Sequence, residues 1–75
     1  MITAIYDLPT TMDRFTIVLD TMHNLTLREC VAIAENPSMF CQHSSCEVGD
    51  HLGTLIDFND LPTKVKAKLK ELNYC

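Results

Sequence analysis

Apolar and polar residues alternate along several stretches of the chain, which is the pattern of half-buried β-strands. The clearest stretch covers residues 14–20, where every second residue from Phe15 to Leu19 is apolar. Residues 52–58 alternate in the same way, and residues 1–6 do so over a shorter length. β-Branched and aromatic side chains dominate the first of these stretches, which favours a pleated surface. The pattern predicts strands at about 14–20 and 52–58, with a short one at 1–6.

Residues 27–34 fit two patterns. Thr26 and Glu29 have the spacing of a capping box, and apolar residues of the segment share one helical face. Val31 and Ile33, however, alternate with smaller residues, and the segment follows a predicted strand through a short turn, as in a hairpin. We therefore predict a strand over 27–34, with a helix as the alternative.

The last part of the chain has a helical period. Apolar residues recur at spacings of three and four, at Leu61, Val65, Leu69 and Leu72. Pro62 suits a first helical turn, where its missing N–H needs no partner, and Asp60 lies where the helix dipole favours an anion. Asn73 suits a C-terminal cap. These signals predict a helix over about 61–72.

Together these elements predict one α+β domain over residues 1–75. Its fold should be a small antiparallel sheet of three or four strands with one C-terminal helix packed on it. The sheet face under the helix should be formed by Phe15, Ile17, Leu19, Ile56 and Phe58.

A long stretch, residues 35–51, shows no regular hydrophobic period and predicts a loop. Long structured loops in small domains often carry function. Gly49 and Gly53 flank His51, which indicates special backbone angles or the close approach of another backbone. We expect Asn36, Gly49, His51 and Gly53 to shape the loop, with His51 hydrogen-bonded to carbonyl groups of the loop.

Composition and charge narrow the function classes. The 75 residues are 47% hydrophobic, as in folded domains, and contain no apolar run of about 20 residues for a membrane span. The net charge of −4 divides into −7 over residues 1–60 and +3 over residues 61–75. We expect no direct binding of nucleic acid, whose partners are basic, and no membrane. The N-terminus lacks the features of a signal peptide, so we expect a cytoplasmic protein. Its four cysteines should then be thiols or metal ligands rather than disulfides.

The candidate chemistry is sparse. Four residues of types that bind zinc fall within eleven positions, Cys41, His43, Cys46 and His51, but their spacing differs from that of paired zinc knuckles. No phosphate-binding loop, dinucleotide fingerprint or zinc-protease motif is present, and neither loop cysteine adjoins a glycine-rich segment. We predict that the protein is no enzyme and needs no cofactor, with a zinc-stabilised module as the alternative.

The remaining features favour binding to a protein. Aromatic and Met side chains on loops are typical interface anchors, and an acidic surface suits a basic partner. The predicted partner-binding residues are Met39, Phe40, Gln42, Glu47, Asp50 and Asp57. A further alternative is an acidic mimic of nucleic acid. Sequence leaves both the monomer and the homodimer open.

Scattered short motifs carry a resemblance. They are Glu35-Asn36-Pro37, Phe40-x-Gln42, Gly49-x-His51-Leu52-Gly53 and Asp60-Leu61-Pro62. Over roughly residues 14–72 this skeleton resembles a group of short uncharacterised accessory proteins of tailed bacteriophages. The resemblance implies a phage-encoded inhibitor or adaptor that acts in the host cytoplasm. Its partner would be a host protein or a defence complex such as a CRISPR effector.

Overall fold

The protein is an antiparallel sheet with one C-terminal helix. We analysed a computed structural model, which describes residues 2–22, 24–36 and 42–74. The strands are β1 (Ile2–Asp7), β2 (Phe15–Met22), β3 (Leu27–Ile33), β4 (Gln42–Glu47) and β5 (Thr54–Ile56), and the helix is α1 (Thr63–Glu71). Two short 3-10 helices, η1 (Asp50–Leu52) and η2 (Phe58–Asp60), flank β5. The predicted α+β class is confirmed, with five strands among the described residues in place of three or four.

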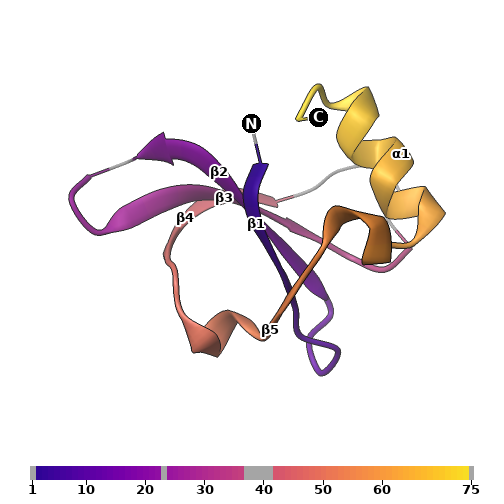
Figure 1. Ribbon diagram of the computed structural model, residues 1–75, viewed down its shortest axis with the longest axis horizontal. Coiled ribbons are helices and arrows are strands. Elements are labelled where there is room, and N and C mark those ends of the chain that lie inside the picture. The colour runs from indigo at the N-terminus through magenta and orange to yellow at the C-terminus, as the bar shows by residue number, and fades with distance from the viewer. Residues whose placement is uncertain (1, 23, 37–41, 75) are drawn as a thin grey trace.

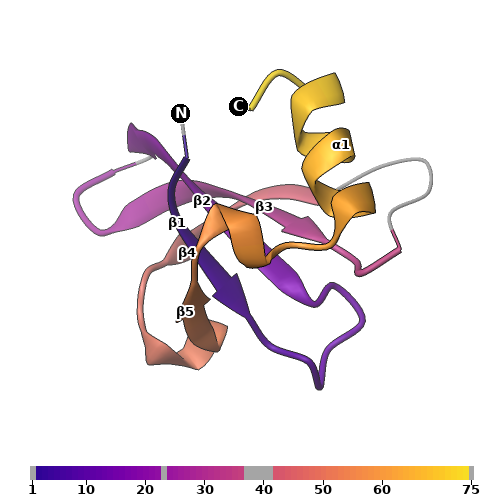
Figure 2. The same ribbon diagram turned by 45° about the vertical axis from the view of Figure 1, so that its right-hand side comes forward.

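The strand order is β4-β3-β2-β1-β5, and every neighbouring pair is antiparallel. The first four strands form a meander, so the chain leaves the sheet at the β4 edge. It must then cross the sheet through η1 to add β5 on the far side of β1. Figures 1 and 2 both show this crossover, residues 48–53, on the side of the sheet opposite α1.

The core lies between α1 and one face of the sheet. Val65 and Leu69 of the helix are fully buried against strand residues, and Leu61 joins them from the segment before the helix. The strands contribute Ile5, Phe15, Ile17, Leu19, Val31 and Ile33. Ile56 of β5 and Phe58 of η2 pack against this cluster, as predicted, but the strand predicted over 52–58 is only Thr54–Ile56, and Phe58 lies in the 3-10 turn after it. Burying each such side chain stabilises the fold by about 1.5–3 kcal/mol.

The helix ends as its sequence predicts. Asn73 has a positive φ of 65°, and its N–H donates to the carbonyl of Lys70 at 3.1 Å. The N–H of Tyr74 donates to the carbonyl of Leu69 at 3.0 Å. These two bonds form a Schellman motif, and Tyr74 packs against the core as the motif's usual hydrophobic contact. The turn fixes the direction in which the chain leaves the helix.

The start of the helix differs from the expectation. The helix begins at Thr63, with Pro62 at the cap position, rather than at residue 61. Asp60 belongs to the preceding 3-10 turn, where its carboxylate accepts the backbone N–H of Asp57 at 3.1 Å. The carboxylate therefore caps η2 and not α1.

The predicted loop over residues 35–51 is wrong in its second half, which contains β4. This strand reads Gln42-His43-Ser44-Ser45-Cys46-Glu47 and pairs along its length with β3. As an outer strand it has one neighbour and buries no apolar row, so its residues lack the alternation that identifies inner strands. The strand predicted over 27–34, by contrast, is confirmed as β3, which ends at Ile33.

The expectation of free thiols is also wrong for two cysteines, because Cys30 and Cys46 form a disulfide with a Cα–Cα distance of 6.3 Å. Cys30 lies opposite Ser44 in the ladder, so Cys46, two residues further, shares its face on the diagonal. Because the sequence did not predict β4, it gave no indication that Cys30 and Cys46 lie close together. The bond lies on the sheet face away from α1, where Cys30 and Val18 are buried outside the main core cluster.

Candidate functional site

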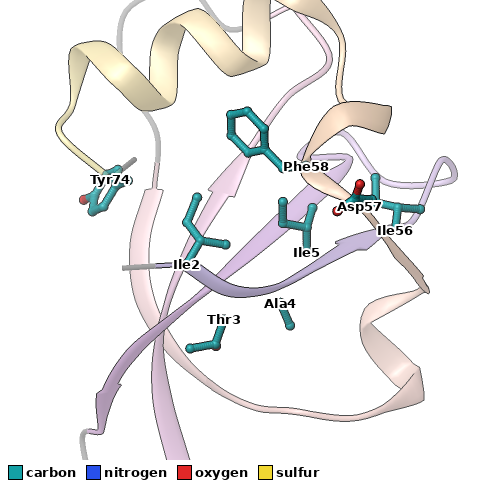
Figure 3. A pocket seen from close by; sticks show the side chains of 8 residues that line it. All are labelled: Ile2, Thr3, Ala4, Ile5, Ile56, Asp57, Phe58 and Tyr74. Carbon is teal, nitrogen blue, oxygen red and sulfur yellow. The ribbon is translucent and has the colours of Figure 1, made fainter.

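A surface pocket of about 430 Å³ lies where β1, β5 and the C-terminal segment meet. It is lined by Ile2, Thr3, Ala4, Ile5, Ile56, Asp57, Phe58 and Tyr74. Figure 3 shows Ile2, Ile5, Phe58 and Tyr74 on the helix side of β1, with Thr3 and Ala4 on its other side. The lining is mostly apolar; its carboxylate comes from Asp57 and its phenol from Tyr74.

A β-bulge places these β1 residues. The β1–β2 register shifts between Ile2, which pairs with Leu19, and Ala4, which pairs with Val18. The hydroxyl of Thr3 donates to the carbonyl of Val18 at 3.2 Å. Because of the shift, Ile2 and Ile5 both pack toward the core, although they are three residues apart. Simple alternation of Ile2, Ala4 and Tyr6 did not reveal this pocket wall.

The pocket borders an unpaired stretch of strand edge. β5 pairs only with Ile5, Tyr6 and Asp7, after which the chain turns away into η2. The edge of residues 2–4 facing away from β2 thus has no strand beside it in the described part of the chain. Figure 3 shows β1 in front of the strands behind it, with this edge toward the viewer. An open edge presents backbone donors and acceptors to another chain.

Tyr74, which lines the pocket near the C-terminus, also contacts a residue outside the pocket. The Tyr74 ring lies 6.3 Å from the His43 ring of β4 in an edge-on arrangement. His43 in turn approaches the Glu29 carboxylate, with Nε2 3.7 Å from Oε1. Tyr74 therefore connects the pocket to the outer strand β4, and the Schellman turn before it sets its position.

The predicted partner-binding residues do not gather at one place. Met39 and Phe40 lie outside the described residues. Gln42 begins β4 and Glu47 ends it, Asp50 lies in η1, and Asp57 lies between β5 and η2. Glu47, Asp50 and Asp57 are all exposed. β4 and β5 form opposite edges of the sheet, and of the predicted residues that the structure describes, only Asp57 lines the pocket.

Of the predicted loop-shaping residues, Gly53 has the clearest role. It has a φ of +114°, and a Cβ there would lie 2.2 Å from the carbonyl oxygen of Asp7. Only glycine can combine this angle with such a close approach to β1. Gly49 is different, because its backbone is extended and a Cβ would meet the imidazole of His51 at 3.1 Å.

His51 and Asn36 are both exposed. His51 lies in η1, where the bonds are between backbone groups: Leu52 N–H donates to Gly49 and Gly53 N–H to Asp50, both at 3.1 Å. Among the described residues the His51 side chain makes no hydrogen bond, so the expected bonds to loop carbonyls have no counterpart there.

The zinc alternative loses one ligand to the disulfide. Cys46 is bonded to Cys30, Cys41 lies outside the described residues, and His43 and His51 belong to different elements. No group of three metal-binding side chains lies together within residues 2–22, 24–36 and 42–74.

The ion pairs of Arg14, which shift a pKa, lie at the end of β1 away from the pocket. The Arg14 guanidinium donates two hydrogen bonds to the Asp7 carboxylate, at 2.6 and 2.9 Å, and a third to Glu35 at 3.1 Å. The hydrogen bonds from Arg14 hold the pKa of Asp7 below its ordinary value. This cluster joins the ends of β1, β2 and β3. The lowered pKa of Asp7 is therefore explained by a structural ion pair and does not indicate a catalytic site.

No protein-family model, curated protein or solved structure matches the chain. Across the described residues, no helix has the length and apolar character needed to cross a membrane.

Proposed function

We propose that this protein is a non-catalytic module that binds another protein. The observation that carries the proposal is the apolar pocket between β1, β5 and Tyr74. Its walls are aliphatic and aromatic, and Asp57 and Tyr74 supply its ionisable groups. That lining suits an inserted apolar side chain of a partner, the usual anchor of a protein interface.

The charge distribution supports a protein partner with a basic surface. Nine acidic residues accompany two arginines over residues 1–60, and four lysines and Glu71 follow. An acidic surface speeds encounter with a basic one and disfavours acidic competitors.

The motif resemblance extends the proposal to a phage-encoded inhibitor or adaptor of a host protein or defence complex. A cytoplasmic site of action belongs to the same proposal, and the Cys30–Cys46 bond weighs against it, because the cytosol keeps most thiols reduced. Trapping the thiols with an alkylating reagent during lysis, followed by mass spectrometry, would show which state the protein has in cells.

Affinity capture from bacterial lysate, with mass spectrometry of the bound proteins, tests the function. The test variant is Asp57→Lys, which reverses a charge at the pocket, and the matched control is Asp13→Lys, which reverses the charge of an exposed acid in the turn between β1 and β2. The loop pair Phe40→Ala and Glu47→Lys, tested together, probes the alternative that the predicted loop carries the contact. We expect specific capture that Asp57→Lys weakens and Asp13→Lys preserves. Capture of no protein by the wild-type chain, together with a turnover activity on a small molecule, would contradict the proposal.

A further inference from the structure

The open strand edge and the pocket beside it identify the form that a partner would take. This inference rests on the proposed function and names the partner's chemistry. We infer that the protein binds an extended, basic segment of its partner, which adds as a strand to β1 at residues 2–4. An apolar side chain of that segment enters the pocket, and a neighbouring Lys or Arg lies at Asp57.

The backbone supports strand addition at this position. β1 pairs with β2 from Ile2 to Asp7, apart from the bulge at Thr3, yet β5 covers only its second half, from Ile5 to Asp7. An added segment would continue the row that β5 begins. In strand addition, hydrogen bonds between the two main chains supply affinity, and pockets for alternate side chains supply specificity.

The pocket lies where one of those side chains would point. Ile2 and Ile5 form its wall on the helix side of β1, and Phe58 and Tyr74 complete that side, as Figure 3 shows. Side chains of an added strand alternate between the two faces of the sheet. Every second residue of the segment would thus face the pocket, and a branched or aromatic side chain there would bury apolar surface.

Charge selects a basic segment over a second copy of this chain. The exposed carboxylate of Asp57 is part of the pocket, and Asp60 follows in the same 3-10 turn. A second copy would carry the same acidic turn and a net charge of −4. A Lys or Arg would instead pair with the carboxylate, which favours a partner segment of alternating apolar and basic residues.

The test uses the full-length protein and peptides selected on it. A random ten-residue peptide library is selected against the wild-type protein, and the binders are added to isotope-labelled protein for amide NMR. We expect the selected peptides to alternate apolar and basic residues and to shift the amides of residues 2–5 and 56–58. Amide exchange at residues 2–4 should slow on binding. Two further peptides carry N-methyl groups at the odd or at the even positions. The form that loses the N–H groups bonded to β1 should not bind, and the other form should bind.

Asp57→Asn is the matched variant, because it removes the charge and keeps a side chain of the same size before η2, and Asp13→Asn, at an exposed acid in the turn between β1 and β2, is its control. Binding should weaken about two- to fivefold for Asp57→Asn, as for an exposed ion pair, and stay unchanged for Asp13→Asn. The inference is overturned if no selected peptide shifts residues 2–5, if shifts map to the β4 edge, or if both N-methylated forms bind fully. Protection of residues 2–4 that rises with protein concentration in the absence of peptide would overturn it in favour of a homodimer. Capture of a host protein that does not depend on this edge would leave the proposed function standing and this inference refuted.

Discussion

The two faces of the sheet are stabilised in different ways. On the α1 side, nine buried apolar residues of the described ranges, from the strands, the helix and the segment before it, form one cluster. On the crossover side, Val18 and Cys30 are buried outside that cluster, next to the Cys30–Cys46 disulfide. One face thus depends on apolar burial and the other on a covalent bond. A domain of this size has little core to spare, so both are expected to matter.

The largest effect should come from the helix face. Leu69→Ala removes a fully buried side chain at the centre of the core. It should lower the free energy of unfolding by about 2–5 kcal/mol through lost burial and the cavity left behind. Urea unfolding followed by circular dichroism measures this loss. Leu72→Ala is the control, because Leu72 is 39% exposed. Equal losses for the two variants would show that α1 is not docked as described.

The crossover face should respond most to loss of the disulfide. Replacing Cys30 and Cys46 together by Ala should cost about 3 kcal/mol, since the bond closes a loop of roughly fifteen residues. A reductant should lower the melting temperature of the wild-type protein and leave that of the double variant unchanged. Equal sensitivity of both proteins to reductant would mean that the bond does not contribute to stability.

A smaller effect on the same side should come from the end of the crossover. Gly53→Ala puts a Cβ at a position with a φ of +114° and against the carbonyl of Asp7. It should lower the free energy of unfolding by about 1–3 kcal/mol. Gly49→Ala is the matched control, because its backbone is extended and the neighbouring His51 ring can move. Thermal melts of the two variants should separate them. If Gly49→Ala is the more damaging, the crossover is not fixed to β1 at Gly53.

The ion pair at the sheet end should give the smallest effect, and one that depends on pH. Since Arg14 lowers the pKa of Asp7 in the folded protein, the pair stabilises the fold above the ordinary carboxyl pKa of 3.8. That contribution should vanish as pH falls through the lower folded value. Asp7→Asn should therefore be less stable than wild type near neutral pH, and the difference should shrink below pH 3.8. Asp13→Asn, which removes an exposed acid from the adjacent turn, should show no such dependence in urea melts.

The elements that sequence predicts best are those with apolar rows of their own. β2 alternates because its inward side chains enter the core, and α1 shows a stripe because Val65 and Leu69 do so. β4 has no such row, so neither the strand nor the disulfide that depends on it could be predicted. The pocket was missed for a related reason, because the bulge at Thr3 interrupts the alternation of β1. The sequence predicted that Gly53 has a special backbone angle or a close backbone neighbour, but it could not predict that this neighbour is the carbonyl of Asp7.

The disulfide also changes what a protease can do to this chain. Residues 31–45 lie inside the covalent ring closed by Cys30 and Cys46, and this ring includes Met39 and Phe40. A single cut within the ring opens the backbone but releases no fragment until the bond is reduced. A nicked protein would run as one band on a non-reducing gel and as two on a reducing gel. Cleavage there would therefore leave β3 and β4 joined and every strand still attached to the molecule.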